Sequence, residues 1–322
     1  MHPGQLPNRV EPTDKNSPSH PRAGQLQAVL SALGFATGGY LTKRFESAGG
    51  AAMTLIAFRM LAGLAVFGGV AAARGYRLPS RKLVAIGLGL GGVQLVSNSA
   101  LIVGFAKAPA SLVVLVFYVY PLLVVAGGAL LFGEGVGRNR AVLIAAGLTG
   151  LVLAVGTPAS VTVVGVTLGL SAGIGMASFI LGSRYAFEQG MQVIQLLALS
   201  YACPSVLMVA LLATGVVPLP SLTTDAIAPM IGFIALGSVI PVVLFVSAIR
   251  RIGAGMTALL ATIEPFAAVV LAYLLLDESL TALQLVGGAL IITAAALLSI
   301  LPAGAGVSRR GSGSSRARAR RA

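Results

Sequence analysis

The stretches KAPASLVVLVFYVYPLLVVAGGALLFGE, residues 107–134, and RIGAGMTALLATIEPFAAVVLAYLLLDE, residues 251–278, decide the fold of this chain. They align without a gap at an offset of 144 positions. Each begins with a basic residue and continues as an apolar run about as long as a helix needs to cross a bilayer. The identical pairs are Ala110/Ala254, Leu115/Leu259, Pro121/Pro265, Val125/Val269, Leu130/Leu274, Leu131/Leu275 and Glu134/Glu278. The chain therefore contains one membrane-spanning unit twice.

Each copy carries a proline near its middle, Pro121 in the first and Pro265 in the second. A proline inside a helix removes one backbone donor and displaces the carbonyl four residues earlier, here that of Phe117 or Ala261. Lipid cannot satisfy a freed carbonyl at membrane depth, so protein or a wet cavity has to supply its partner. The sequence therefore predicts a helix kink at both prolines, on a side that does not face lipid.

The residue before the proline is Tyr120 in the first copy and Glu264 in the second. Glu264 lies about 15 Å from either end of its apolar run, which is the depth of the bilayer centre. An ionised carboxylate facing lipid there costs several kcal/mol, so we expect Glu264 to face the protein interior. Two roles stay open. The carboxyl binds a cationic group or a proton, or it is a protonated structural group that satisfies the carbonyls freed by Pro265.

Composition places the chain among polytopic membrane proteins. It is 57% hydrophobic and 10% charged with a mean hydropathy of +0.94, whereas charged residues approach about a quarter of soluble domains. The single cysteine, Cys203, excludes an intramolecular disulfide, and both histidines, His2 and His20, lie near the N-terminus. Metal centres and hydrolase chemistry therefore have almost no residues to be built from. Without a G-x-x-x-x-G-K-[ST] loop we expect no ATP motor and no cofactor.

Ten candidate spans lie between two polar, low-complexity tails. We expect residues 1–23 and 302–322 to be disordered cytoplasmic tails, the second rich in arginine and suited to lie on anionic lipid. The spans make two units, 24–157 and 163–301. They are predicted at 24–41, 51–73, 83–106, 110–132, 140–157, 163–183, 192–216, 227–249, 254–276 and 281–301.

Basic residues predict the orientation of these spans. With the N-terminus in the cytoplasm, 18 of the 22 bases lie inside, three lie outside, and Arg59 lies within a span. This asymmetry predicts a multi-pass protein of the inner membrane with both termini cytoplasmic, and it explains the net charge of +13 without a nucleic-acid partner. Because each unit holds an odd number of spans, the second enters the bilayer from the opposite face. The predicted fold is all-α, with ten helices in two five-helix inverted repeats, as in secondary transporters.

Further polar residues in the apolar runs are candidates for the binding site. Tyr118 and Tyr120 diverge by about 200° on a continuous helix, so we expect at most one to face a cavity, and we favour Tyr120. Gln94 and Asn98 share one helix face, where substrate contact and interhelical hydrogen bonding are both open.

Arg59 lies about 12 Å inside the second span. It can snorkel outward, pair with Glu46 or Glu264, or receive a substrate carboxylate. The structural role is favoured.

Glycines at spacing four mark close helix packing. Gly87 and Gly91 form one such pair, and Gly165, Gly169 and Gly173 extend the spacing over two turns of the sixth span. Small residues at this spacing let helix backbones approach each other. We therefore expect them to serve packing and not substrate contact.

The motifs FGEGVGRNRAVLIAAG at 132–147 and LDESLTALQLVGGALII at 276–292 follow the two proline-containing runs. Together with IAFRMLAGL around Arg59 and the Glu-Pro pair of TIEPFAAVVLAYLLLDE, they make the chain resemble the EamA family of the drug/metabolite transporter superfamily from about residue 26 to 301. The resemblance implies a ten-helix carrier that usually exports a small metabolite. The first span departs from the family because it lacks a tryptophan often found there, with Tyr40 the local aromatic.

The sequence thus predicts a secondary active transporter and not an enzyme. Efflux of a small metabolite or amino acid by alternating access, with proton coupling through Glu264 as a hypothesis, is the favoured function. A facilitative channel or a lipid-interacting scaffold without coupled transport is the alternative. The expected partners are a small-molecule substrate, protons and membrane lipids, with the chain as a monomer or homodimer.

Overall fold

The computed structural model describes residues 21–108, 110–133, 137–155, 161–217, 219, 223–276 and 281–300, and these residues form helices and connecting turns without a strand. The first helix begins at Pro21, so residues 21–23 belong to it and not to the predicted tail. The rest of that tail and the arginine-rich C-terminal segment lie outside the described residues.

Helices occupy all ten predicted positions. Seven positions hold single helices: α1 (Pro21–Ser47), α2 (Ala52–Ala73), α3 (Arg81–Lys107), α6 (Arg138–Val155), α7 (Val163–Glu188), α8 (Val193–Ala213) and α13 (Ala282–Ile300). The other three are divided: α4 (Ala110–Phe117) with α5 (Tyr120–Phe132); α9 (Thr224–Ile234), the π-helix η1 (Ala235–Val239) and α10 (Ile240–Ile252); and α11 (Ala254–Leu260) with α12 (Ile263–Leu276).

Membrane-spanning character is not equal among these helices. Seven helical stretches of the described chain are long and apolar enough to cross a membrane, whereas α6 and α13 offer shorter apolar stretches, Ala141–Val155 and Ala282–Leu297. The long α1 is not among the seven, and it carries bases near both ends. The structure thus shows a multi-helix membrane protein. That all ten segments cross the membrane is part of the function proposed for it.

Local sequence explains where several helices begin and end. The Ser80 hydroxyl accepts a hydrogen bond from the Leu83 amide at the start of α3, and the Thr162 hydroxyl accepts one from the Gly165 amide at the start of α7. Gly133 ends α5 at φ +69°, a left-handed conformation that favours glycine. These caps satisfy backbone groups that a helix terminus leaves unpaired.

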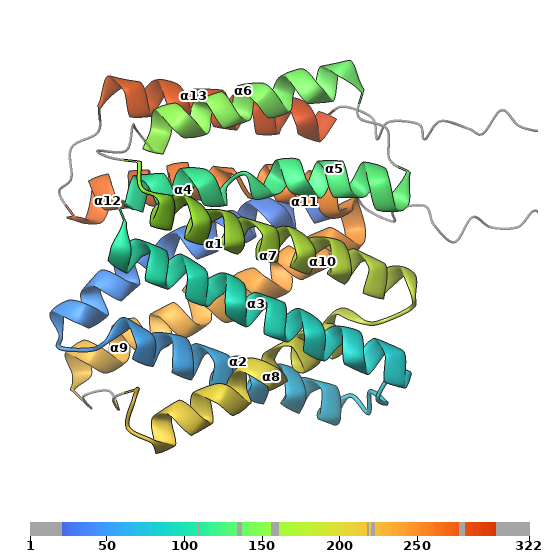
Figure 1. Ribbon diagram of the computed structural model, residues 1–322, viewed down its shortest axis with the longest axis vertical. Coiled ribbons are helices and arrows are strands. Elements are labelled where there is room, and N and C mark those ends of the chain that lie inside the picture. Colours follow the sequence, from blue (N-terminus) through green and yellow to red (C-terminus); the bar gives the residue numbers. More distant parts are fainter. Residues whose placement is uncertain are drawn as a thin grey trace, which may run out of the picture.

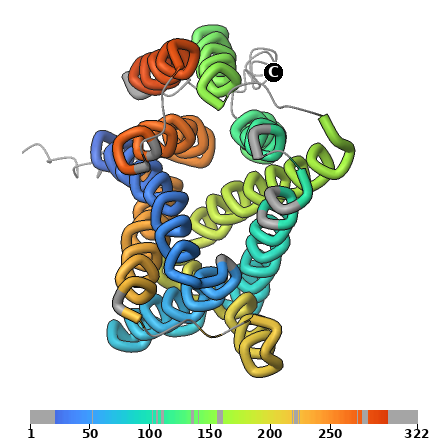
Figure 2. The backbone as a smooth tube through the Cα atoms, turned by 90° about the vertical axis from the view of Figure 1, so that its left-hand side faces the viewer, coloured from blue at the N-terminus to red at the C-terminus, as the bar shows by residue number. Residues whose placement is uncertain are grey.

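The helices stack in layers in which the two halves of the chain alternate (Figure 1). α6 and α13 pack together at the top, α5 packs on α11 below them, and α2 packs on α8 at the bottom. The pairs α6 with α13 and α2 with α8 join corresponding helices of the two halves, whereas α5 packs on α11, which corresponds to α4. Figure 2 shows the pair of α6 and α13, in green and red, as a layer of its own. Two further large interfaces also join the two halves, since α3 packs on α7 and α1 packs on α10.

The two proline-containing units run in opposite directions. In Figure 1 the chain passes from α4 to α5 from left to right, and from α11 to α12 from right to left. This is the inverted arrangement expected when each half contains an odd number of helices.

The predicted glycine contacts are packing contacts. A Cβ on Gly169 would lie 2.9 Å from the Val113 carbonyl oxygen, and one on Gly173 would lie 2.8 Å from that of Phe117. A Cβ on Gly91 would lie 2.4 Å from the Ser200 carbonyl oxygen. Glycine therefore lets α7 approach α4, and lets α3 approach α8, at backbone distance.

Three side-chain hydrogen bonds join helix ends at one end of the bundle. The Lys82 ammonium donates to the Tyr185 hydroxyl at 3.0 Å, and the Arg250 guanidinium donates to the Gln192 amide oxygen at 2.6 Å. The Gln195 amide donates to the Arg77 carbonyl at 2.8 Å. These bonds bring the start of α3 and α8 to the end of α7 and α10, so three basic segments, around Arg81, Arg184 and Arg250, meet at the same end.

Candidate functional site

Both proline-containing runs are interrupted just before the proline. α4 ends at Phe117 and α5 begins at Tyr120, while α11 ends at Leu260 and α12 begins at Ile263. The backbone continues through tight turns, with the Val119 amide bonded to the Val116 carbonyl at 3.2 Å in the first repeat. Each run is thus two short helices joined at membrane depth.

The carbonyls at these interruptions lie against other parts of the protein, and those of the second repeat accept hydrogen bonds there. In the second repeat the Ala261 carbonyl accepts from the Glu264 amide at 3.0 Å, and the Leu259 carbonyl accepts from the Thr262 hydroxyl at 2.7 Å. In the first repeat the Phe117 carbonyl lies against Gly173 of α7. The backbone is therefore kept away from lipid, as its chemistry requires.

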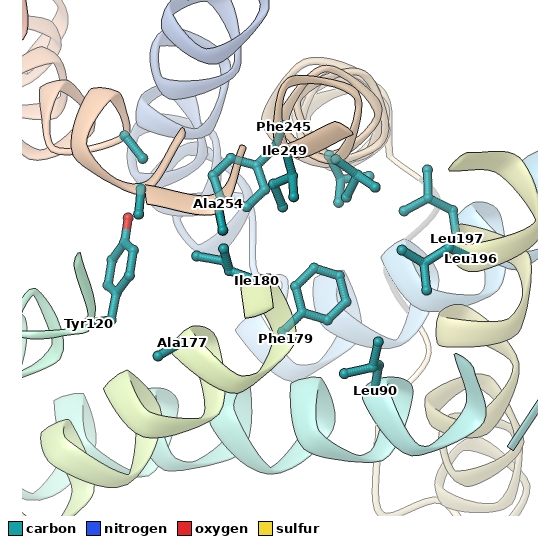
Figure 3. Packing of buried hydrophobic residues seen from close by; sticks show 14 of the residues in the cluster. Leu90, Tyr120, Ala177, Phe179, Ile180, Leu196, Leu197, Phe245, Ile249 and Ala254 are labelled. Atoms are coloured by element: carbon teal, nitrogen blue, oxygen red, sulfur yellow. The ribbon is translucent and has the colours of Figure 1, made fainter. Parts of the chain in front are cut away.

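Glu264 lies in the first turn of α12 and is half-buried. Its carboxyl is within hydrogen-bonding range of the Tyr118 hydroxyl and close enough to Tyr120 for an electrostatic interaction. Both tyrosines are buried, with 5% and 1% of their surface exposed. Figure 3 shows Tyr120 reaching from the first repeat toward the orange helices of the second. The acid thus faces tyrosines of the opposite repeat.

The structure brings Tyr118 and Tyr120 together, although on a continuous helix they would point apart. The Tyr118 and Tyr120 rings lie 5.6 Å apart, and each lies 5.2 Å from the ring of Phe117. The divergence of about 200° applies to a continuous helix. Because the helix is interrupted at Tyr118 and Val119, the rings converge, and Tyr118 is the residue within bonding range of Glu264.

Gln94 and Asn98 both carry buried polar atoms that have no hydrogen-bond partner, Oε1 of Gln94 and Nδ2 of Asn98. The neighbouring Ser97 differs, because its hydroxyl donates to the Ala172 carbonyl of α7 at 2.7 Å. An interhelical hydrogen bond thus satisfies the Ser97 hydroxyl, whereas no such bond satisfies Oε1 of Gln94 or Nδ2 of Asn98. Unpartnered buried polar groups are rare and are suited to meet a ligand or water.

Sequence reasoning did not identify Gln27 of α1, whose Oε1 is also buried without a partner. The available signal was an amide one turn before Ser31 in an apolar helix, and Ser31 itself donates to the Pro241 carbonyl at 2.8 Å. Buried amide atoms on both α1 and α3 thus lack a hydrogen-bond partner.

Arg59 of α2 is half-buried, and its Nε is buried without a hydrogen-bond partner. In the described chain no ion pair joins it to Glu46 or Glu264, so the predicted alternatives of pairing are wrong. Its guanidinium lies instead in electrostatic range of the Tyr201 hydroxyl, which is within hydrogen-bonding range of Ser238. Neither Tyr201 nor Ser238 was identified from the sequence.

Comparison with known proteins gives three results. The EamA-like transporter family model matches residues 22–156 and again residues 163–300. A solved structure described as "Crystal structure of protein" superposes with a TM-score of 0.69 at 21% identity, covering 88% of this chain and 99% of that chain. At that identity the likeness shows the fold alone. No curated protein matches the chain. With two family matches that cover most of its length, the chain belongs to the EamA-like transporter family, a membrane transporter family of the drug/metabolite transporter superfamily.

Proposed function

We propose that this chain is a secondary carrier of the inner membrane that moves a small metabolite or amino acid out of the cytoplasm by alternating access. In this proposal all ten helical segments cross the bilayer and both termini lie in the cytoplasm. Family membership supports transport, and the opposite direction of the two repeats supports a substrate site between them.

One observation carries the role of Glu264. The Ala261 carbonyl is satisfied by the Glu264 backbone amide, and the Leu259 carbonyl by the Thr262 hydroxyl. The carboxyl is therefore not needed to repair the backbone, which was its structural alternative. It lies toward Tyr118 and Tyr120 of the other repeat. A carboxyl between two repeats can bind a proton or a cationic group and release it when the repeats move apart.

Transport into proteoliposomes tests this proposal. The purified full chain is assayed over a panel of amino acids and other small metabolites, with and without an imposed proton gradient. We expect saturable uptake of at least one compound. For E264Q the rate falls at least about tenfold, the factor expected when one charge-assisted contact is lost.

The control is E188Q, which makes the same change from carboxylate to amide at an exposed residue that pairs with Arg184 at 3.0 Å. We expect it to transport like the wild type. Unchanged transport and pH dependence in a folded E264Q would exclude the role of Glu264. Ion conductance without saturable uptake would show a channel instead of a carrier.

A further inference from the structure

Arg59 is a half-buried cation of α2 whose Nε is buried without a hydrogen-bond partner. It lies two turns inside α2, and the part of the chain that the structure describes gives its Nε no hydrogen-bond partner and its guanidinium no carboxylate. A base that only held helices together would be expected to have such partners, because an unpaired buried charge is destabilising. The missing partner is therefore informative.

The surroundings of Arg59 are polar and fixed in position. The Tyr201 ring rests on Gly63, where a Cβ would come within 2.2 Å of it, and it meets the Phe67 ring edge-on at 5.2 Å. Its hydroxyl is thereby held in electrostatic range of Arg59 and in hydrogen-bonding range of Ser238. Ser238 is 1% exposed and belongs to the π-helix η1. Single π-turns within α-helices frequently occur at functional sites.

We propose that Arg59, Tyr201 and Ser238 form a binding site for one carboxylate group of the transported substrate. The guanidinium offers paired donors that match a carboxylate, and the two hydroxyls can each donate a further bond. One base balances one negative charge, which favours a carboxylate over a phosphate with nearly two. This inference rests on the proposed function and adds a substrate class to it.

The position of the site agrees with that of the acid. α2 and α8 lie at the bottom of Figure 1, whereas α4, α5, α11 and α12 lie in its upper half. The carboxylate site is thus carried by a different layer from Glu264, where a substrate carboxylate would meet a like charge.

Protection from arginine modification tests the site without transport. The full chain in phosphatidylcholine nanodiscs is treated with phenylglyoxal, and modification of Arg59 is followed by mass spectrometry. Ligands are the twenty L-amino acids and short monocarboxylates, each beside its uncharged amide. We expect Arg59 to react, and at least one acid at ten times its Kd to slow the reaction about tenfold, since about a tenth of the sites are then empty. The amide should not protect.

Two variants separate the site from helix packing. Y201F keeps the ring on Gly63 and removes the hydroxyl, and we expect it to weaken protection several-fold. S205A removes a hydroxyl that donates to the Met60 carbonyl at 3.0 Å across the same pair of helices, and it should leave protection unchanged. Equal loss in both variants would mean that α2 is displaced, and the assignment would be wrong.

The remaining outcomes are also decisive. An Arg59 that does not react, acids and amides that protect equally, or protection only when phosphatidylglycerol is added would each overturn the site, the last by showing a lipid headgroup. Protection in a chain that transports no compound would keep this site and contradict the proposed function. If R59Q transported acids at the wild-type KM, the proposed function would stand and the carboxylate site at Arg59 would be contradicted.

Discussion

Tyr118 is the side chain whose hydroxyl comes within bonding range of the Glu264 carboxyl, so the two residues should be energetically coupled. We predict that Y118F and E264Q are non-additive in unfolding free energy by about 1 kcal/mol, the size of a hydrogen bond inside a membrane protein. A double-mutant cycle measured by unfolding in mixed detergent checks this. The pair Y120F and E264Q is the comparison, and a larger coupling there would show that Tyr120 is the partner.

Sequence reasoning found Glu264 because a carboxyl beside a mid-membrane proline has few harmless explanations. It ranked Tyr118 too low because it treated 110–132 as a continuous helix, and a two-residue interruption changes which side chains converge. Tyr201 and Ser238 could not be identified from the sequence for another reason. Their relation to Arg59 depends on how α2, α8 and η1 pack, and no local pattern encodes that contact.

At the scale of elements, helix packing depends on glycines that no side chain can replace. A Cβ on Gly173 would lie 2.8 Å from the Phe117 carbonyl, directly before the interruption between α4 and α5. We predict that G173A lowers the unfolding free energy by about 2 kcal/mol, because overpacking forces the two helices apart. Thermal unfolding in detergent measures the change.

The control for this prediction is G89A on α3. Gly89 is exposed, and a Cβ there would meet nothing within 4 Å. We expect a change within about 0.5 kcal/mol. If G173A were as harmless as G89A, the glycine spacing would not be what brings α7 against α4.

Helix positions were predictable from the sequence to within a few residues. In lipid an apolar run of this length has to satisfy its own backbone hydrogen bonds, and it does so as a helix. The breaks in the fourth and ninth segments followed from Pro121 and Pro265. The π-turn in η1 was not predicted. Pro241 follows it and cannot donate to the Gly237 carbonyl four residues earlier, and a Cβ on Gly34 of α1 would lie 3.1 Å from the Leu236 carbonyl. The close approach of η1 to α1 depends on both segments together, so neither segment predicts it alone.

For the whole molecule, the contact pattern relates the two halves by an approximate two-fold axis. The pairs α2 with α8 and α6 with α13 join corresponding helices, and α3 on α7 corresponds to α10 on α1. Bonds from Lys82, Gln195 and Arg250 collect three basic segments at one end, which is the end expected to face the cytoplasm.

This arrangement predicts which loops an impermeant thiol reagent can reach in intact cells. In a C203S background, S47C and T214C should be labelled from outside, whereas Y76C and Q189C should be labelled only after the cells are opened; all four positions are exposed. Positions 47 and 76 belong to the first repeat, and 189 and 214 are in the second. Because α2 and α8 each cross the membrane and run antiparallel in an inverted repeat, positions 47 and 214 share one side and positions 76 and 189 share the other. Labelling of 47 together with 189 from one side, and of 76 with 214 from the other, would contradict the inverted repeat, and an exact exchange of the two predicted pairs would contradict only the cytoplasmic N-terminus.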